Sequence, residues 1–174
     1  MNILVLGIGN VLMRDEAIGV RVVEELGKRF CFSQEVELLD GGTSGIELLG
    51  YISNRDHLVI IDAIRAGHPP GTVLRVEGED VPAQFQTRIS PHQLGISDLL
   101  ATAMISDQMP KNLLLFGVEP KEITMGLGLT DEVRAGMERL IVLVAEHLKS
   151  LGCDVRESDG ADACGPSIWE EVKN

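Results

Sequence analysis

Three side chains in this sequence combine the donor types that a divalent metal ion uses in proteins: the carboxylates of Glu16 and Asp62 and the imidazole of His92. Glu16 follows the first predicted strand, Asp62 ends the third, and His92 opens a predicted helix. Sites in an open parallel sheet form beyond the carboxyl ends of its strands, so we expect the three to gather at one edge. Such a trio would leave coordination positions for water or substrate.

Each member of this trio also has a structural explanation. Glu16 would stabilise a helix N-terminus, Asp62 would cap the turn after its strand, and His92 would be an exposed first-turn residue. The helix dipole disfavours an imidazolium there, which would keep His92 neutral and able to ligate. Carboxylates at strand ends are common in such sheets, so spacing alone leaves both explanations open. The remaining histidines are expected to be structural or solvated: His57, His68 and His147.

A second candidate loop is Asp40-Gly41-Gly42-Thr43, which follows the second predicted strand. Its glycines would let the backbone of a ligand or a peptide come close, and its acidic start disfavours phosphate. A tight strand-to-helix turn, with Thr43 or Ser44 as N-cap, explains the same residues. A binding role and a simple turn therefore both remain open for this loop.

The stretch from Gly7 to Leu12, Gly-Ile-Gly-Asn-Val-Leu, begins like a dinucleotide-binding fingerprint but does not complete it. Leu12 stands where the third glycine would allow the helix to pack closely on the strand. An anionic pyrophosphate would also meet the carboxylates of Asp15 and Glu16. We therefore expect a different kind of site after the first strand.

The elements that position these residues follow from hydrophobic periodicity. Short apolar runs predict buried parallel strands at 3–6, 36–39, 58–61 and 113–118, with an added strand over 72–76. Helices are predicted over 18–30, over 45–53, from Ser90-Pro91 onward, and from Thr130 to Leu151. The helix that begins at Ser90-Pro91 is expected to bury one apolar face, made of Leu94, Leu99, Leu100, Ala103 and Met104. Residues 77–90 look irregular and polar.

Alternating strands and helices predict one α/β domain over residues 1–152, a three-layer, doubly wound, mostly parallel sheet with helices on both faces. Residues 153–174, short of large apolar side chains, are expected to be a flexible tail.

Composition narrows the possible partners and compartments. The chain has 174 residues, 44% of them hydrophobic but only 3% aromatic, so its core must consist mainly of aliphatic side chains. The net charge of −12 argues against a nucleic-acid or anionic-membrane partner, and it permits a metal cation or a basic protein. Scattered cysteines without a Cys-x-x-Cys motif, and no predicted signal or membrane span, favour a cytoplasmic protein.

Five segments together resemble the [NiFe]-hydrogenase maturation endopeptidases: GIGNVLMRDEAIGV, LLDGGTSGIELL, IIDAI, SPHQLGISDLL and LFGVEP followed by GLGLT. The resemblance covers residues 2–150 and leaves out the tail. It implies an endopeptidase that removes a short C-terminal extension from the nickel-loaded precursor of a hydrogenase large subunit. It also implies that Glu16, Asp62 and His92 are the metal ligands, and that the Asp40–Thr43 loop serves substrate recognition or catalysis.

Two mechanisms fit these residues. In one, the enzyme holds its own divalent metal, which polarises the scissile carbonyl and activates a water molecule. In the other, which we favour as a hypothesis, nickel belongs to the substrate and is contacted through Glu16, Asp62 and His92. Asp40 would then act as the general base and Gly41, Gly42 and Thr43 would bind the substrate. Other divalent metals could also occupy the trio.

Two other classes of function stay open at this point. A non-catalytic chaperone that binds the nickel-loaded large subunit would need the same ligands and would leave the precursor's mass unchanged. A nucleotide-binding oxidoreductase would be stabilised by NAD or NADP, although the missing third glycine argues against it.

Overall fold

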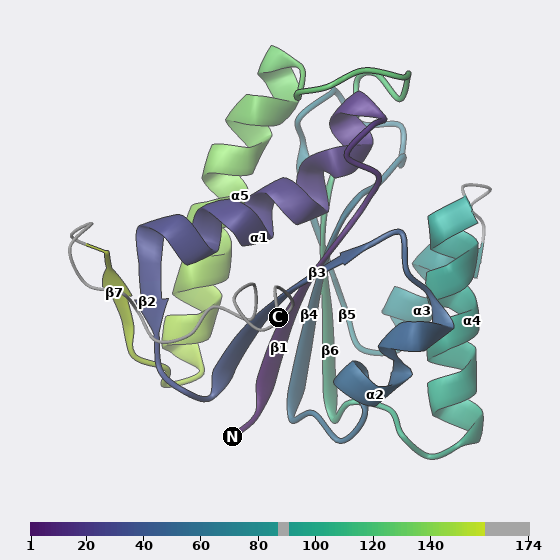
Figure 1. Ribbon diagram of the computed structural model, residues 1–174, viewed down its shortest axis with the longest axis vertical. Coiled ribbons are helices and arrows are strands. Elements are labelled where there is room, and N and C mark those ends of the chain that lie inside the picture. The colour runs from purple at the N-terminus through teal and green to yellow at the C-terminus, as the bar shows by residue number, and fades with distance from the viewer. Residues whose placement is uncertain (87–90, 159–174) are drawn as a thin grey trace, which may run out of the picture.

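A mostly parallel sheet runs through the middle of the molecule (Figure 1). The computed structural model describes residues 1–86 and 91–158, and in it five strands lie side by side in the order β3-β1-β4-β6-β5. Four of them are parallel and β5 is antiparallel to its neighbour β6. Their bounds are β1 Ile3–Ile8, β3 Val36–Gly42, β4 His57–Ala63, β5 Val73–Glu77 and β6 Asn112–Val118.

Helices cover both faces of this sheet, as the sequence predicts (Figure 1). On one face lie α1 (Ile18–Arg29) and α5 (Asp131–Ser150). On the other lie α2 (Leu49–Ile52), α3 (Asp80–Gln86) and α4 (Pro91–Ile105). Two short 3-10 helices, η1 (Arg14–Ala17) and η2 (Ile46–Leu48), precede α1 and α2. The predicted fold class is thereby confirmed.

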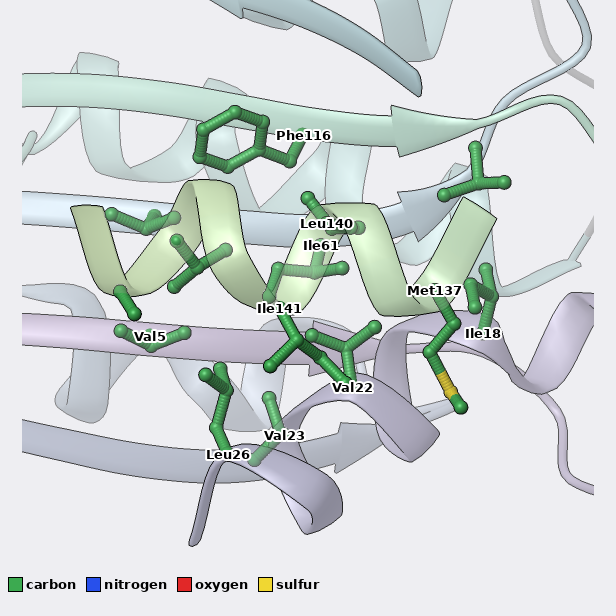
Figure 2. Packing of buried hydrophobic residues seen from close by; sticks show 14 of the residues in the cluster. Val5, Ile18, Val22, Val23, Leu26, Ile61, Phe116, Met137, Leu140 and Ile141 are labelled. Carbon is green, nitrogen blue, oxygen red and sulfur yellow. The ribbon is translucent and has the colours of Figure 1, made fainter. Parts of the chain in front are cut away.

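The core on the α1 and α5 side is built mainly from aliphatic side chains (Figure 2). Val22 and Leu26 of α1 and Leu140 of α5 are fully buried, and they face Ile61 and Phe116 of the sheet. These helix residues recur at the spacing of one helical face, and the strands are apolar on both faces. Burial of this surface is the main force that holds the helices on the sheet.

Half of the segment expected to be irregular, residues 77–90, instead forms the helix α3 over Asp80–Gln86. Val81 and Phe85, four residues apart, are 0% and 1% exposed and belong to the core on the α4 side. Their spacing places both on one helical face, so two buried side chains suffice to hold this short polar helix. Residues 87–90, including the expected N-cap Ser90, lie outside the described residues.

The apolar face predicted for α4 is partly wrong. Leu99, Leu100 and Ala103 are buried as expected, but Leu94 is 52% and Met104 is 61% exposed. Ile96 is fully buried in their place. Because α4 is apolar on several sides, its periodicity does not identify the buried face.

A small second sheet lies at the end of α1. Phe30–Phe32, expected to close the first helix, forms β2, and it pairs antiparallel with β7 (Val155–Glu157). Cys153 and Val155 are buried, so the chain remains packed on the domain beyond residue 152, where we expected the tail to begin. The rest of that tail, residues 159–174, lies outside the described residues. Among the described helices, none is long and apolar enough to cross a membrane.

Candidate active site at the carboxyl edge of the sheet

The first strand and the first helix pack unusually closely, and glycines make this possible. A Cβ atom on Gly19 would lie 2.1 Å from the carbonyl oxygen of Ile61 and 2.2 Å from that of Ile8. A Cβ atom on Gly7 would lie 2.2 Å from the carbonyl oxygen of Gly19. Gly19 therefore performs the packing role of the absent third fingerprint glycine, further along the chain. The intervening residues are left free to form a longer loop.

That longer loop carries Glu16 to the carboxyl edge of the sheet. Gly9 has φ +142°, and a Cβ atom there would lie 1.8 Å from the carbonyl oxygen of Glu16. This close approach holds η1 against the end of β1, and η1 also contacts β4. The Glu16 side chain is only 7% exposed. A buried carboxylate in this position must interact with hydrogen-bond donors or a cation, because burying a charge alone is costly.

Asp62, at the end of β4, is fully buried at the same edge. Its Oδ1 accepts a hydrogen bond of 2.7 Å from the backbone N–H of Ala63. The Nε2 of Gln93 donates to Asp62 Oδ2 and to the carbonyl oxygen of Ala63, both at 3.3 Å. Gln93 is itself buried in the first turn of α4. This side chain joins the start of α4, the helix that includes His92, to the end of β4.

Two members of the predicted trio, Glu16 and Asp62, are thus buried carboxylates at one sheet edge, and the backbone of His92 begins the helix beside them. The side chain of His92 lies outside the described residues, and within those residues no three potential metal ligands are grouped. Two buried carboxylates, one of them held by the donors Ala63 and Gln93, are a chemically suitable partial donor set for a divalent ion.

The Asp40–Thr43 segment, expected as a loop after the second strand, begins within β3, which extends to Gly42 and pairs with β1; we keep the name Asp40 loop for it. Asp40 Oδ1 accepts a hydrogen bond of 2.8 Å from the N–H of Gly42, which adopts φ +50°. The N–H of Gly9 donates to the carbonyl oxygen of Gly42 at 2.9 Å, which ties this loop to the loop after β1. Burial raises the pKa of the half-buried Asp40 carboxyl, and the Gly42 N–H offsets part of that effect. Thr43 is exposed.

The same loop also contacts the first turns of α4. A Cβ atom on Gly45 would lie 2.9 Å from the Cα atom of Gly95, so the two backbones touch. Asp40, Asp62 and the start of α4 are consequently held along one edge, as the sequence predicts for an open parallel sheet.

Asp15 is a buried residue whose role sequence reasoning missed. Its carboxylate is fully buried and accepts hydrogen bonds from the backbone N–H groups of Lys121 (3.0 Å), Glu122 (2.8 Å) and Thr130 (2.7 Å). It therefore joins η1 to the loop between β6 and α5. The sequence signals only an acidic residue before a helix, which does not reveal partners more than 100 residues away.

Two of the other histidines, His57 and His147, lie apart from this edge. The pKa of His147 is lowered, mainly by burial, and its ring meets that of Phe116 edge-on with the ring centres 6.3 Å apart. His57 begins β4, at the amino end of the sheet. The N–H of His68 donates to buried Glu119 in the turn after β4.

The chain is similar in sequence to a known protein family and to several of its members. Residues 20–147 match the family model described as hydrogenase maturation protease. The hydrogenase 2 maturation protease of Escherichia coli is 48% identical over 155 residues, which are 88% of this chain and 94% of that protein. The hydrogenase expression/formation protein HoxM of Azotobacter vinelandii is 42% identical, over 91% of this chain and 78% of that protein.

The fold is also similar to that of solved structures. The hydrogenase maturating endopeptidase HybD of E. coli superposes with a TM-score of 0.88 at 46% identity, covering 92% of this chain and all of that one. The [NiFe] hydrogenase maturation protease HybD of Thermococcus kodakarensis gives a TM-score of 0.70 at 28% identity, over 84% of this chain and 99% of the other.

Proposed function

The chain belongs to the hydrogenase maturation protease family, whose members hydrolyse a peptide bond, and we propose that it removes a short C-terminal extension from the nickel-loaded precursor of a [NiFe]-hydrogenase large subunit. The proposal is supported by one observation above all. Two buried carboxylates, Glu16 and Asp62, lie at the sheet edge where the half-buried Asp40 and the first turn of α4 also lie. A non-catalytic chaperone is not favoured, because the matched family and the relatives from E. coli are described as proteases.

Nickel enters this proposal as part of the substrate. Glu16, Asp62 and His92 would complete its coordination and so hold the cleavage point against the enzyme. Oxygen and imidazole ligands of this kind suit a borderline divalent ion. A precursor without nickel would lack the bridging ion and would bind poorly, so the trio would act as a check on loading. Gln93, which donates to Asp62, would orient that carboxylate as outer-shell donors do at metal sites.

Hydrolysis needs a base close to the bond that is cut, and Asp40 is our candidate. Its raised pKa makes the carboxylate a better proton acceptor than an exposed aspartate. In the proposed step, Asp40 takes a proton from water while the water oxygen bonds to the scissile carbonyl carbon. The carbon–nitrogen bond then breaks, and the proton passes from Asp40 to the leaving amine. Gly41, Gly42 and Thr43 would bind the peptide backbone next to this base.

An intact-mass assay tests the function directly. The purified protein is incubated with the large-subunit precursor, prepared with and without nickel, and the precursor is weighed by mass spectrometry. We expect a C-terminal peptide to be lost only from the loaded form. Equal cleavage of both forms would refute the nickel check, and no change in mass with a precursor shown to be loaded would refute the protease function on this substrate.

A further inference from the structure

We propose that exposed apolar side chains on both sides of the site form the surface on which the precursor docks. We call this surface the apolar rim, and the inference rests on the function proposed above. On one side it consists of Leu12, Met125 and Leu127, which are 59%, 87% and 74% exposed. On the other side it consists of Ile46 and Leu94, which are 49% and 52% exposed.

The first half of the rim comes from two loops that lie side by side at the top of Figure 1. Met13 and Gly126 form a parallel bridge, and the N–H of Gly126 donates to the carbonyl oxygen of Leu12 at 2.9 Å. Leu12 and its neighbours thereby meet Met125 and Leu127 at one place, although they are more than 100 residues apart in the sequence. Glu16 follows Leu12 on the same loop.

These loops are held firmly, so their apolar side chains cannot simply fold inward. The carboxylate of Asp15 accepts hydrogen bonds from the backbone of Lys121, Glu122 and Thr130, as described above. Arg14 adopts φ +46°, a left-handed conformation that a non-glycine residue keeps only where its surroundings fix it. A Cβ atom on Gly126 would lie 3.1 Å from Arg14 Nε, so the contact between the two loops is tight.

The second half of the rim lies across the site, over the other helical layer. Ile46 begins η2 after the Asp40 loop, and Leu94 is in the first turn of α4. The touching backbones of Gly45 and Gly95 bring these two elements together. Gln93, next to Leu94, contacts Asp62. The buried carboxylates are therefore flanked by apolar side chains from both directions.

The position of the rim identifies its occupant as the precursor. A scissile peptide that reaches Asp40 and the trio must cross this edge, so the surfaces that flank the peptide must lie on the rim. Exposed leucine, isoleucine and methionine side chains bind apolar protein surface and add nothing to the binding of an ion. The chain carries a net charge of −12, yet the rim residues are uncharged. We infer that the precursor presents an apolar surface beside its cleavage point.

A matched pair of triple variants tests the inference. The rim variant carries Leu12→Ser, Met125→Ser and Leu127→Ser. The control variant carries Met104→Ser, Ile105→Ser and Leu143→Ser, which replace side chains that are 61%, 88% and 40% exposed away from this edge. All six positions are exposed, so both variants should fold, and thermal unfolding checks this. Cleavage of the nickel-loaded precursor gives kcat and KM, and immobilised precursor gives the affinity of each variant.

We expect the rim variant to lose at least about tenfold in kcat/KM, carried by KM, while kcat at saturating precursor stays within about twofold. The affinity should fall by the same factor, and the control variant should match the wild type. A folded rim variant with unchanged kcat/KM and affinity would overturn the docking surface and leave the protease function standing. A wild type that binds the precursor without cutting it would refute the function alone, and the affinities would still decide the rim. A wild type that neither binds nor cuts it would overturn both.

Discussion

Replacement of Asp15 should destabilise the protein strongly, although this residue is not part of the proposed chemistry. Its fully buried carboxylate accepts three backbone hydrogen bonds, from Lys121, Glu122 and Thr130. Hydrogen bonds to a charged group stabilise by about 1.5–3 kcal/mol each, so the three together would reach about 4.5–9 kcal/mol. Lys121 and Glu122 are exposed residues whose N–H groups can be rehydrated after the change. We therefore expect Asp15→Ala to lower the free energy of unfolding by about 3–5 kcal/mol.

Asp15→Asn offers a finer test because it keeps the shape of the side chain. The side-chain oxygen at the position of Oδ2 can still accept from Lys121 and Glu122. The amide nitrogen at the position of Oδ1 would face the N–H of Thr130, and it would donate to the hydroxyl oxygen of Thr130 instead. One hydrogen bond is lost rather than three, so we expect the free energy of unfolding to fall by about 2 kcal/mol.

Urea unfolding at pH 7 measures both variants, with the wild type and Glu122→Gln for comparison. The Glu122 side chain forms an exposed ion pair of 3.6 Å with Arg14, so its change to glutamine, which leaves the backbone N–H in place, should cost less than about 0.5 kcal/mol. The comparison is valid if all variants show the same dependence on urea concentration. An Asp15→Ala protein within about 1 kcal/mol of the wild type would refute the reasoning, because the three bonds would then be replaced by water at little cost.

Four further predictions concern the site. Asp40→Asn should reduce cleavage by at least about a thousandfold with little change in precursor affinity, and a rate within tenfold of wild type would remove Asp40 as the base. Burial raises the pKa of Asp40 in the folded state, so between the unfolded and folded pKa values the folded state binds more protons than the unfolded state. The contribution of Asp40 to stability is therefore lost as pH rises through these two values. Asp40→Asn should remove this part of the pH dependence of unfolding, measured by urea titrations at several pH values. His92→Ala should abolish processing with an unchanged circular dichroism spectrum, and normal cleavage of loaded precursor would exclude His92 from the site. If nickel belongs to the substrate, the isolated protein should lose divalent metal on simple dialysis, whereas one zinc retained per chain, with activity lost on its removal, would contradict this.

Local sequence patterns predict most of the layers of this fold. The central strands appear as continuous apolar runs because they are buried on both faces of the sheet. Helix α5 shows a stripe of apolar residues because it buries one face. The patterns fail where a few buried residues determine whether a segment is helical or which face of a helix is buried. Val81 and Phe85 hold α3 in a polar segment, and α4 is apolar on more than one side, so Leu94 looks like a core residue although it is exposed.

The candidate site was predictable to a different degree for each residue. Glu16, Asp62 and the Asp40 loop follow predicted strands, and topology alone brings strand ends to one edge. Gln93 and Asp15 could not be assigned, since their roles consist of contacts with segments 30 or more residues away. The packing role of Gly19 could not be predicted either, because the long loop after β1 places this glycine seven residues beyond the third fingerprint position, which Leu12 occupies.

The contact between Gly45 and Gly95 has a consequence for how this protein can vary. A Cβ atom on Gly45 would lie 2.9 Å from the Cα atom of Gly95, and one on Gly95 would lie 3.1 Å from the Cα atom of Gly45. Each backbone occupies the space that a methyl group on the other would need, so neither position can acquire even alanine without moving the Asp40 loop away from α4. The separation between the Asp40 loop and the start of α4 is thus set by the absence of two side chains. We therefore expect both positions to tolerate no side chain, although exposed positions nearby accept one.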